Sequence, residues 1–169
     1  FTGDVAIQGE RIVDVGRIQG AARRILDADG LLVAPGFVDV HTHYDGQATW
    51  DPLLTPSCWH GVTTAVMGNC GVGFAPMKPE RRQFLIELME GVEDIPGSVL
   101  SEGLDFDWET LPQYFDALER RPHTIDIATQ VQHSPLRLYV MGERGADHLN
   151  APSEAEIATM ARLVSEGIA

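Results

Sequence analysis

The stretch that decides the fold is Ala34-Pro35-Gly36-Phe37-Val38-Asp39-Val40-His41-Thr42-His43-Tyr44-Asp45. Pro35-Gly36 breaks the chain, and residues 37–40 follow as a short, mostly apolar, β-branched run of the kind that is buried inside a parallel sheet. His41 and His43 come directly after this run, and residues two apart on an extended chain point the same way. Because neutral imidazole is a preferred zinc ligand, both rings can reach one metal ion. As a bare pattern the pair is weak evidence, since two polar residues at a strand end, satisfied by their neighbours, are the commoner explanation of such a pair.

The residues before this stretch predict a small all-β unit. Residues 4–15 alternate roughly between apolar and polar side chains, with Gly9 where a hairpin would turn, so two short antiparallel strands are expected. Residues 24–33 place aliphatic side chains around the turn signal Asp29-Gly30, which is again typical of strands rather than of a helix.

After the stretch, strands alternate with helices. The expected strands are residues 62–67 and 125–131. The expected helices are residues 56–60, 79–90 with Phe84, Leu85, Leu88 and Met89 on one face, 107–120 capped by Asp107, and a last helix capped by Ser153. The expected loops are residues 93–104 and the strand exit 132–135. This rhythm predicts an α/β fold on a parallel sheet.

The composition excludes several classes of function. The 169 residues are 44% hydrophobic, which suits a globular domain, and the formal net charge of −13 repels nucleic acid and anionic membrane surfaces. No apolar run approaches the roughly 20 residues of a membrane helix, and no export signal is visible. Two cysteines make no disulfide framework, so a cytoplasmic location is expected. The sequence lacks an initiating Met and ends in a helical stretch, so we expect a chain cut at both ends.

A second chemical signal lies at the end of the strand expected at residues 62–67. Gly68-Asn69-Cys70-Gly71 places a thiol at the edge where His41 and His43 would lie, and a thiolate there would bind zinc tightly. On chemistry alone, a single cysteine is more often a small buried hydrophobic residue.

The surrounding residues carry a family resemblance. Residues 34–45 resemble the metal-binding signature of the amidohydrolase superfamily, and residues 60–71 with Ala75-Pro76 resemble its D-aminoacylase branch, the N-acyl-D-amino-acid deacylases. Residues 90–96 and 139–142 extend the likeness, which covers essentially the whole chain. It implies a partial (β/α)8 TIM barrel, with residues 1–34 as part of a small β-sandwich domain and residues 35–169 as the first part of the barrel.

The resemblance also implies a function. It indicates a zinc-dependent hydrolase that cleaves the amide bond of N-acyl-D-amino acids, with one or two Zn²⁺ ions per complete site and with His41, His43 and Cys70 as metal ligands. In that branch the cysteine belongs to the tightly bound zinc and can bridge to a weaker site served by the two histidines. Two further histidines and a general-base aspartate are expected beyond residue 169. This chain alone is therefore expected to be inactive, the rest coming from a second chain or from a missing C-terminal part.

The other candidate residues have weaker signals. His133 follows the third expected strand, where contact with substrate and support of a metal ligand are equally open. Cys58 and His60 are interpreted as structural. His123 and His148 lie in polar segments where exposure is the simpler account.

Two alternatives to the deacylase remain. The first is a cyclic-amide hydrolase like the dihydroorotase and hydantoinase relatives, which usually use a carbamylated lysine. Lys78 is the only lysine here, and it lies in a loop between Pro76 and Pro79 rather than at a strand end. The second is a non-catalytic metal-binding fragment, which the incomplete ligand set supports.

Overall fold

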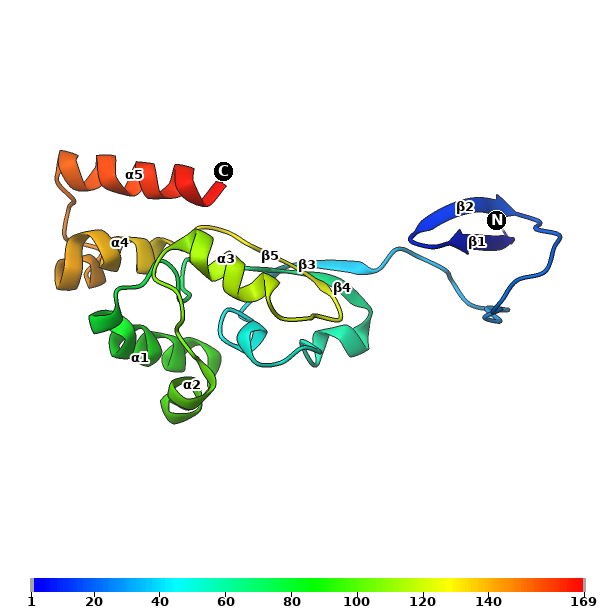
Figure 1. Cartoon of the computed structure of the whole chain (residues 1–169), viewed down its shortest axis with the longest axis horizontal. Coiled ribbons are helices and arrows are strands. Elements are labelled where there is room, and N and C mark those ends of the chain that lie inside the picture. Colours follow the sequence, from blue (N-terminus) through cyan, green and yellow to red (C-terminus); the bar gives the residue numbers. More distant parts are fainter. Residues whose placement is uncertain (1, 169) are drawn as a thin grey trace. The chain divides into compact units, whose positions relative to one another are not determined.

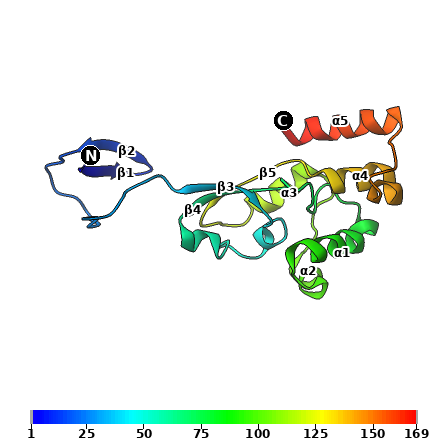
Figure 2. The same ribbon diagram turned by 180° about the vertical axis from the view of Figure 1, so that it is seen from behind.

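The computed structural model describes residues 2–168, which fall into two compact units, Phe1–Pro35 and Gly36–Ala169. Figure 1 labels the strands and α-helices, and Figure 2 shows them from behind. The elements, with η for a short 3-10 helix, are in chain order β1 (Asp4–Gln8), β2 (Arg11–Gly16), β3 (Phe37–Thr42), η1 (Gln47–Thr49), η2 (Ser57–His60), β4 (Val62–Met67), η3 (Pro79–Arg81), α1 (Arg82–Glu93), α2 (Gly97–Gly103), α3 (Leu111–Glu119), β5 (Asp126–Thr129), α4 (His133–Met141), η4 (Gly142–Ala146) and α5 (Glu154–Ile168).

The N-terminal unit is built on one β-hairpin. β1 and β2 pair antiparallel across a turn in which Gly9 has a φ of +63°, so the two predicted strands and their turn are confirmed. The prediction of strands in residues 24–33 is wrong. Within that segment the Leu31 amide donates to the Ala28 carbonyl oxygen at 3.0 Å and closes a turn. A strand needs a hydrogen-bonded neighbour, and no described strand pairs with this segment.

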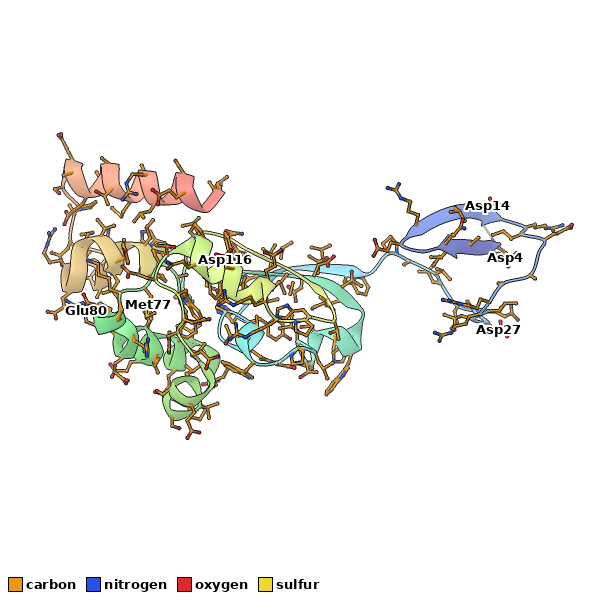
Figure 3. All side chains as sticks on the ribbon, viewed as in Figure 1. Asp4, Asp14, Asp27, Met77, Glu80 and Asp116 are labelled. Carbon is orange, nitrogen blue, oxygen red and sulfur yellow. The ribbon has the colours of Figure 1, made fainter. Side chains whose placement is uncertain are left out.

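This unit has no buried side chain among the described residues 2–35, although it is rich in aliphatic residues. Leu32 is 91% exposed, and the charged side chains of Asp4, Asp14 and Asp27 are exposed as well (Figure 3). A lone two-stranded hairpin is at best marginally stable in water. The exposed hairpin resembles one layer of a β structure whose second layer is not in this unit. The assignment of the unit to a sandwich domain stays a prediction.

The second unit is organised around a parallel sheet in the order β3-β4-β5. β4 has the predicted bounds, β3 runs two residues beyond the predicted 37–40, and β5 is shorter than the predicted 125–131. The central strand buries Ala65 and Met67 completely, whereas Phe37 and Val40 on β3 are more than 60% exposed. The sheet is therefore half covered, with its apolar edge strand β3 open to solvent.

Helices cover part of the sheet, and the longest connection holds more helix than the sequence predicted. η3 and α1 together confirm the helix expected at residues 79–90, but the buried face is Leu85, Ile86 and Met89 rather than one that includes Phe84. The predicted loop at residues 93–104 is wrong, because it contains α2. α2 packs against α1 and buries Leu100 completely, which the glycine- and acid-rich composition of the segment concealed.

One predicted helix start and one predicted loop differ from the structure, and the predicted cap of the last helix is supported. α3 begins after Thr110, which forms a capping box with Gln113, while Asp107 pairs with Arg120 instead of capping. The predicted exit loop at residues 132–135 is wrong beyond its first residue, since α4 begins at His133. The predicted cap of the last helix is supported, because the Ser153 hydroxyl accepts from the Glu156 amide at 3.4 Å.

Buried apolar and exposed charged side chains alternate along the helical segments. Met77 is buried near the start of the helical segment, whereas Glu80 and Asp116 point outward from η3 and α3 (Figure 3). None of the helices in residues 2–168 combines the length and the apolar character needed to cross a membrane.

The entry into β3 generates a testable prediction. A Cβ atom at Gly36 would overlap the side chain of Thr63, including the Thr63 Cβ atom at 2.7 Å, and rotation of the threonine moves its outer atoms only. We expect Gly36→Ala to lower the free energy of unfolding of the full-length protein by about 1–3 kcal/mol, as overpacking does elsewhere. Urea denaturation measures the change.

A matched glycine provides the control. Gly91 lies in α1, and a Cβ atom there would meet nothing within 4 Å. Gly91→Ala is expected to raise the free energy of unfolding by about 0.5–1 kcal/mol, because alanine is the better helix former. Equal stabilities of the two variants would contradict the proposed clash.

Candidate metal centre

All three strands of the parallel sheet end on one row of paired residues. Thr42 of β3 pairs with Met67 of β4, and Met67 pairs with Thr129 of β5. Since the strands are parallel, the segments that follow this row leave from the same carboxyl edge of the sheet. In open and closed parallel sheets alike, this edge is where ligands bind.

An irregularity in β3 affects the direction in which the two histidine side chains point. The register between β3 and β4 shifts between Asp39 and Thr42, and the His41 amide donates to Asp39 Oδ1 at 3.1 Å. Such bulges re-aim side chains beside functional sites. The ring centroids of His41 and His43 lie 5.6 Å apart, so the two rings are neighbours, as their spacing in the sequence predicts.

The structure brings the three predicted metal ligands together. One potential ligand atom from each of His41, His43 and Cys70 lies within 4.8 Å of the others, and His41 Nε2 is 2.7 Å from Cys70 Sγ. In the part of the chain that the structure describes, no other group of three His, Cys, Asp or Glu side chains meets this criterion. Two imidazoles and a thiol form a donor set that suits zinc.

His43 is held in a state that can bind a metal ion. Its side chain is half-buried, and its Nδ1 atom is buried without a hydrogen-bond partner among the described residues. Burial, followed by the neighbouring His41, lowers the pKa of His43. A neutral imidazole keeps a nitrogen lone pair available for a metal, which a protonated ring lacks.

A tight turn presents Cys70 directly after β4. The Gly71 amide donates to the Gly68 carbonyl oxygen at 2.9 Å, and both glycines have a positive φ, +83° for Gly68 and +78° for Gly71. Glycine adopts this backbone region at little cost. The sequence Gly68-Asn69-Cys70-Gly71 therefore lets the chain reverse at the sheet edge with the cysteine exposed.

A buried polar pair lies beside this group, and the sequence did not predict it. Asp45 and Gln132 are both completely buried, and the Gln132 side-chain amide donates to Asp45 Oδ1 at 2.9 Å. Burial raises the pKa of Asp45 to about 7, although hydrogen bonds from its own backbone and from Gln132 oppose the shift. The Tyr114 hydroxyl donates to the Asp45 carbonyl oxygen at 2.7 Å. Polar residues after a strand normally predict an exposed loop, so no sequence signal marked these as buried.

The remaining candidates lie as follows. His133 is exposed at the first position of α4, and the next residue, Ser134, donates its amide to the Gly71 carbonyl oxygen at 2.7 Å. This places His133 beside the Cys70 turn. Cys58 packs partly buried against the core, and His60 is exposed. The Lys78 ammonium lies 5.2 Å from the centre of the Tyr139 ring.

One of the predictions for the other histidines is wrong. His148 is exposed as expected, but His123 is only partly exposed, and its Nε2 atom lies 2.8 Å from the Ala48 carbonyl oxygen. A hydrogen bond to η1, a helix that the sequence did not predict, accounts for the difference.

Comparison with known proteins identifies the family. The sequence profile described as the amidohydrolase family matches residues 24–168. The chain belongs to the amidohydrolase family. This amidohydrolase is 36% identical over 167 residues to D-aminoacylase from Alcaligenes xylosoxydans xylosoxydans, a match that covers 98% of the chain and 31% of the relative. It is 35% identical to N-acyl-D-aspartate deacylase from the same organism, over 98% of the chain and 30% of the relative.

Solved structures agree with this placement in the D-aminoacylase branch. A structure described for the binuclear metal centre of D-aminoacylase matches with a TM-score of 0.78 and 34% identity, over 98% of this amidohydrolase and 32% of that chain. N-acyl-D-glutamate deacylase from Bordetella bronchiseptica, complexed with zinc and a phosphonate mimic of the tetrahedral intermediate, matches with a TM-score of 0.76, 32% identity and the same coverage. The mixed α/β fold of the chain is therefore that of D-aminoacylases, and the chain spans about a third of their length.

The hydrogen bond from Tyr114 to Asp45 can be tested separately from metal binding. Tyr114→Phe leaves a buried carbonyl oxygen without this donor, so we expect the free energy of unfolding of the full-length protein to fall by about 1–3 kcal/mol. Thermal or urea denaturation measures the loss.

Tyr139→Phe is the matched control. The Tyr139 hydroxyl donates to Glu109 Oε1 at 2.7 Å at a part-exposed position, where water can replace the lost donor. A smaller loss, below about 1 kcal/mol, is expected there. If the free energy of unfolding falls equally in both variants, the buried hydrogen bond to Asp45 contributes no more stability than the part-exposed one to Glu109.

Proposed function

We propose that this chain provides the first metal ligands of a zinc-dependent hydrolase that cleaves the amide bond of N-acyl-D-amino acids. The observation that carries the proposal is the convergence of His41, His43 and Cys70 within 4.8 Å at the carboxyl edge of the sheet. The relatives supply the substrate class, since they are a D-aminoacylase and deacylases of N-acyl-D-aspartate and N-acyl-D-glutamate.

The three side chains have distinct parts in the proposed centre. His41 and His43 would bind through ring nitrogens at the end of β3, and Cys70 would bind through its sulfur from the turn after β4. Zinc, when bound, supplies a Lewis acid that polarises a carbonyl and lowers the pKa of water. His41 and Cys70 are exposed in this part of the enzyme, so their ligand atoms are accessible to a metal ion.

The proposed active site needs residues that this chain does not contain. Its three parallel strands are the start of the proposed (β/α)8 barrel, with residues 35–169 in the barrel and residues 1–34 in the proposed sandwich domain. The open apolar edge of β3 and the uncovered hairpin support this division, since both leave surface for further strands. We propose that the remaining histidine ligands and the general-base aspartate come from the other two-thirds of the enzyme, or from a second chain.

His133 is proposed as a neighbour of the substrate. Its backbone lies against the turn that carries Cys70, and its exposed ring is free to meet a bound molecule at the same edge. An imidazole N–H can donate a hydrogen bond to the carboxylate of an N-acyl amino acid.

Metal content tests the ligand assignment. In the full-length protein, elemental analysis is expected to find one or two zinc ions per chain, and Cys70→Ala is expected to lose at least the tightly bound one, because it removes a thiolate ligand. Cys58→Ala is the matched control, since Cys58 packs against the core away from the three converging ligands. A Cys70→Ala variant that keeps all its zinc would contradict the role of Cys70.

Substrate preference tests the reaction. Release of amino acid from N-acetyl-D-amino acids is expected to exceed release from the L enantiomers by orders of magnitude, and removal of zinc with a chelator is expected to abolish it. Dihydroorotate and hydantoins serve as cyclic amides. Faster opening of these rings would favour the cyclic-amide alternative, and zinc binding without turnover of any amide would favour a non-catalytic metal-binding protein.

A further inference from the structure

We infer that Gln132 is a positioning residue of the metal centre, whose buried amide fixes the two segments that carry His43 and Cys70. The inference rests on the proposed metal site. The inference assigns a role to a side chain that makes no direct contact with the three ligands. Gln132 lies in the segment that follows β5, outside the sequence motifs that contain the ligands.

The amide of Gln132 ties together the ends of two strands that do not pair with each other. Its Nε2 atom donates to Asp45 Oδ1 and to Thr129 Oγ1, each at 2.9 Å. Asp45 lies two residues beyond His43, and Thr129 is the last residue of β5. The bond to Asp45 therefore crosses over the end of the central strand β4 and restrains the segment that follows His43.

The aliphatic part of the same side chain packs against the segment that carries Cys70. A Cβ atom added at Gly68 would lie 3.1 Å from Gln132 Cγ, and one added at Gly73 would lie 2.9 Å from it. These two glycines bracket Cys70, one at each end of its loop. The Gln132 side chain reaches Asp45 only because both glycines lack side chains. The loop that carries Cys70 therefore leaves the space that this glutamine fills.

The hydrogen bonds of Gln132 set a geometry that apolar packing alone would not specify. Gln132 and Asp45 are completely buried, and burial of polar groups costs free energy unless every group is paired. Gln132 Oε1 and Asp45 Oδ2 have no hydrogen-bond partner among the described residues. A methionine of similar length would leave Asp45 Oδ1 and Thr129 Oγ1 without the donor that the amide supplies, so the amide contributes a connection that packing alone does not. Groups that hold ligand-bearing segments in place commonly contribute metal affinity.

The test is the zinc dissociation constant of the full-length protein, measured by competition with a chromophoric chelator. Gln132→Met keeps the length of the side chain and its contacts with the glycines but removes the amide. We expect it to raise the dissociation constant roughly 10- to 100-fold, the usual effect of losing such a support. The absorption bands of the Co²⁺-substituted protein should shift as well, because they report on the geometry around the Cys70 thiolate.

Further variants separate positioning from stability. Gln113→Ala removes the capping box of α3, far along the chain from both ligand segments, and is expected to lower thermal stability while leaving the zinc dissociation constant unchanged. Asp45→Ala removes the acceptor of the Gln132 hydrogen bond, so adding Gln132→Met to this variant should have little further effect on zinc binding.

If Gln132→Met does not fold, Thr129→Val provides a second test. It removes the other acceptor of the Gln132 amide with little change of shape and is expected to weaken zinc binding as well.

The outcomes distinguish this inference from the proposed function. Full zinc affinity and an unchanged Co²⁺ spectrum in Gln132→Met, or equal losses in Gln132→Met and Gln113→Ala, overturn the role of Gln132 and leave the metal site standing. A wild-type protein that binds no zinc overturns both.

Discussion

The candidate centre depends on one constraint, the parallel register that ends three strands on the row of Thr42, Met67 and Thr129. Parallel pairing sends every following segment out at the same edge, so residues that are far apart in the sequence meet there, even where their strands, like β3 and β5, do not pair directly. A shift of one residue along β4 would turn its side chains to the opposite face and move Cys70 away from the histidines. The register also determines where the Gln132 amide emerges, and therefore whether it can reach Asp45.

The sequence was sufficient for what local patterns encode. The β1–β2 hairpin, the strand Val62–Met67 and the convergence of His41, His43 and Cys70 were all expected, because alternation, buried β-branched runs and strand-end spacing are local signals. It failed where tertiary contacts decide. The helix Gly97–Gly103 forms in a glycine-rich segment because Leu100 is buried against its neighbours, and the aliphatic residues 24–33 form no strand because none lies beside them. The buried pair of Asp45 and Gln132 was missed for the same reason, since each residue alone is typical of a surface loop.

The distribution of burial separates the two units. In Gly36–Ala169 the aromatic side chains of Phe74, Phe106, Trp108 and Tyr114 form a contiguous cluster beneath the candidate centre's supporting segments, with ring centroids 5.0 to 5.9 Å apart between successive members. This cluster gives Tyr114 the fixed position from which its hydroxyl holds the Asp45 carbonyl oxygen. Residues 2–35 have no such core, so the same chain combines a packed support for the candidate metal ligands with a unit that is stabilised little by its own contacts.

The separation of the ligands along the chain also has a consequence for folding kinetics. His41 and Cys70 are 29 residues apart, and Gln132 lies a further 62 residues along the chain. Closing segments of this length costs chain entropy before any contact repays it, which makes parallel pairings slow to form. The complete group of His41, His43 and Cys70 therefore forms only after β3 and β4 have found their register, and before that point the chain offers a metal ion only the local pair of histidines.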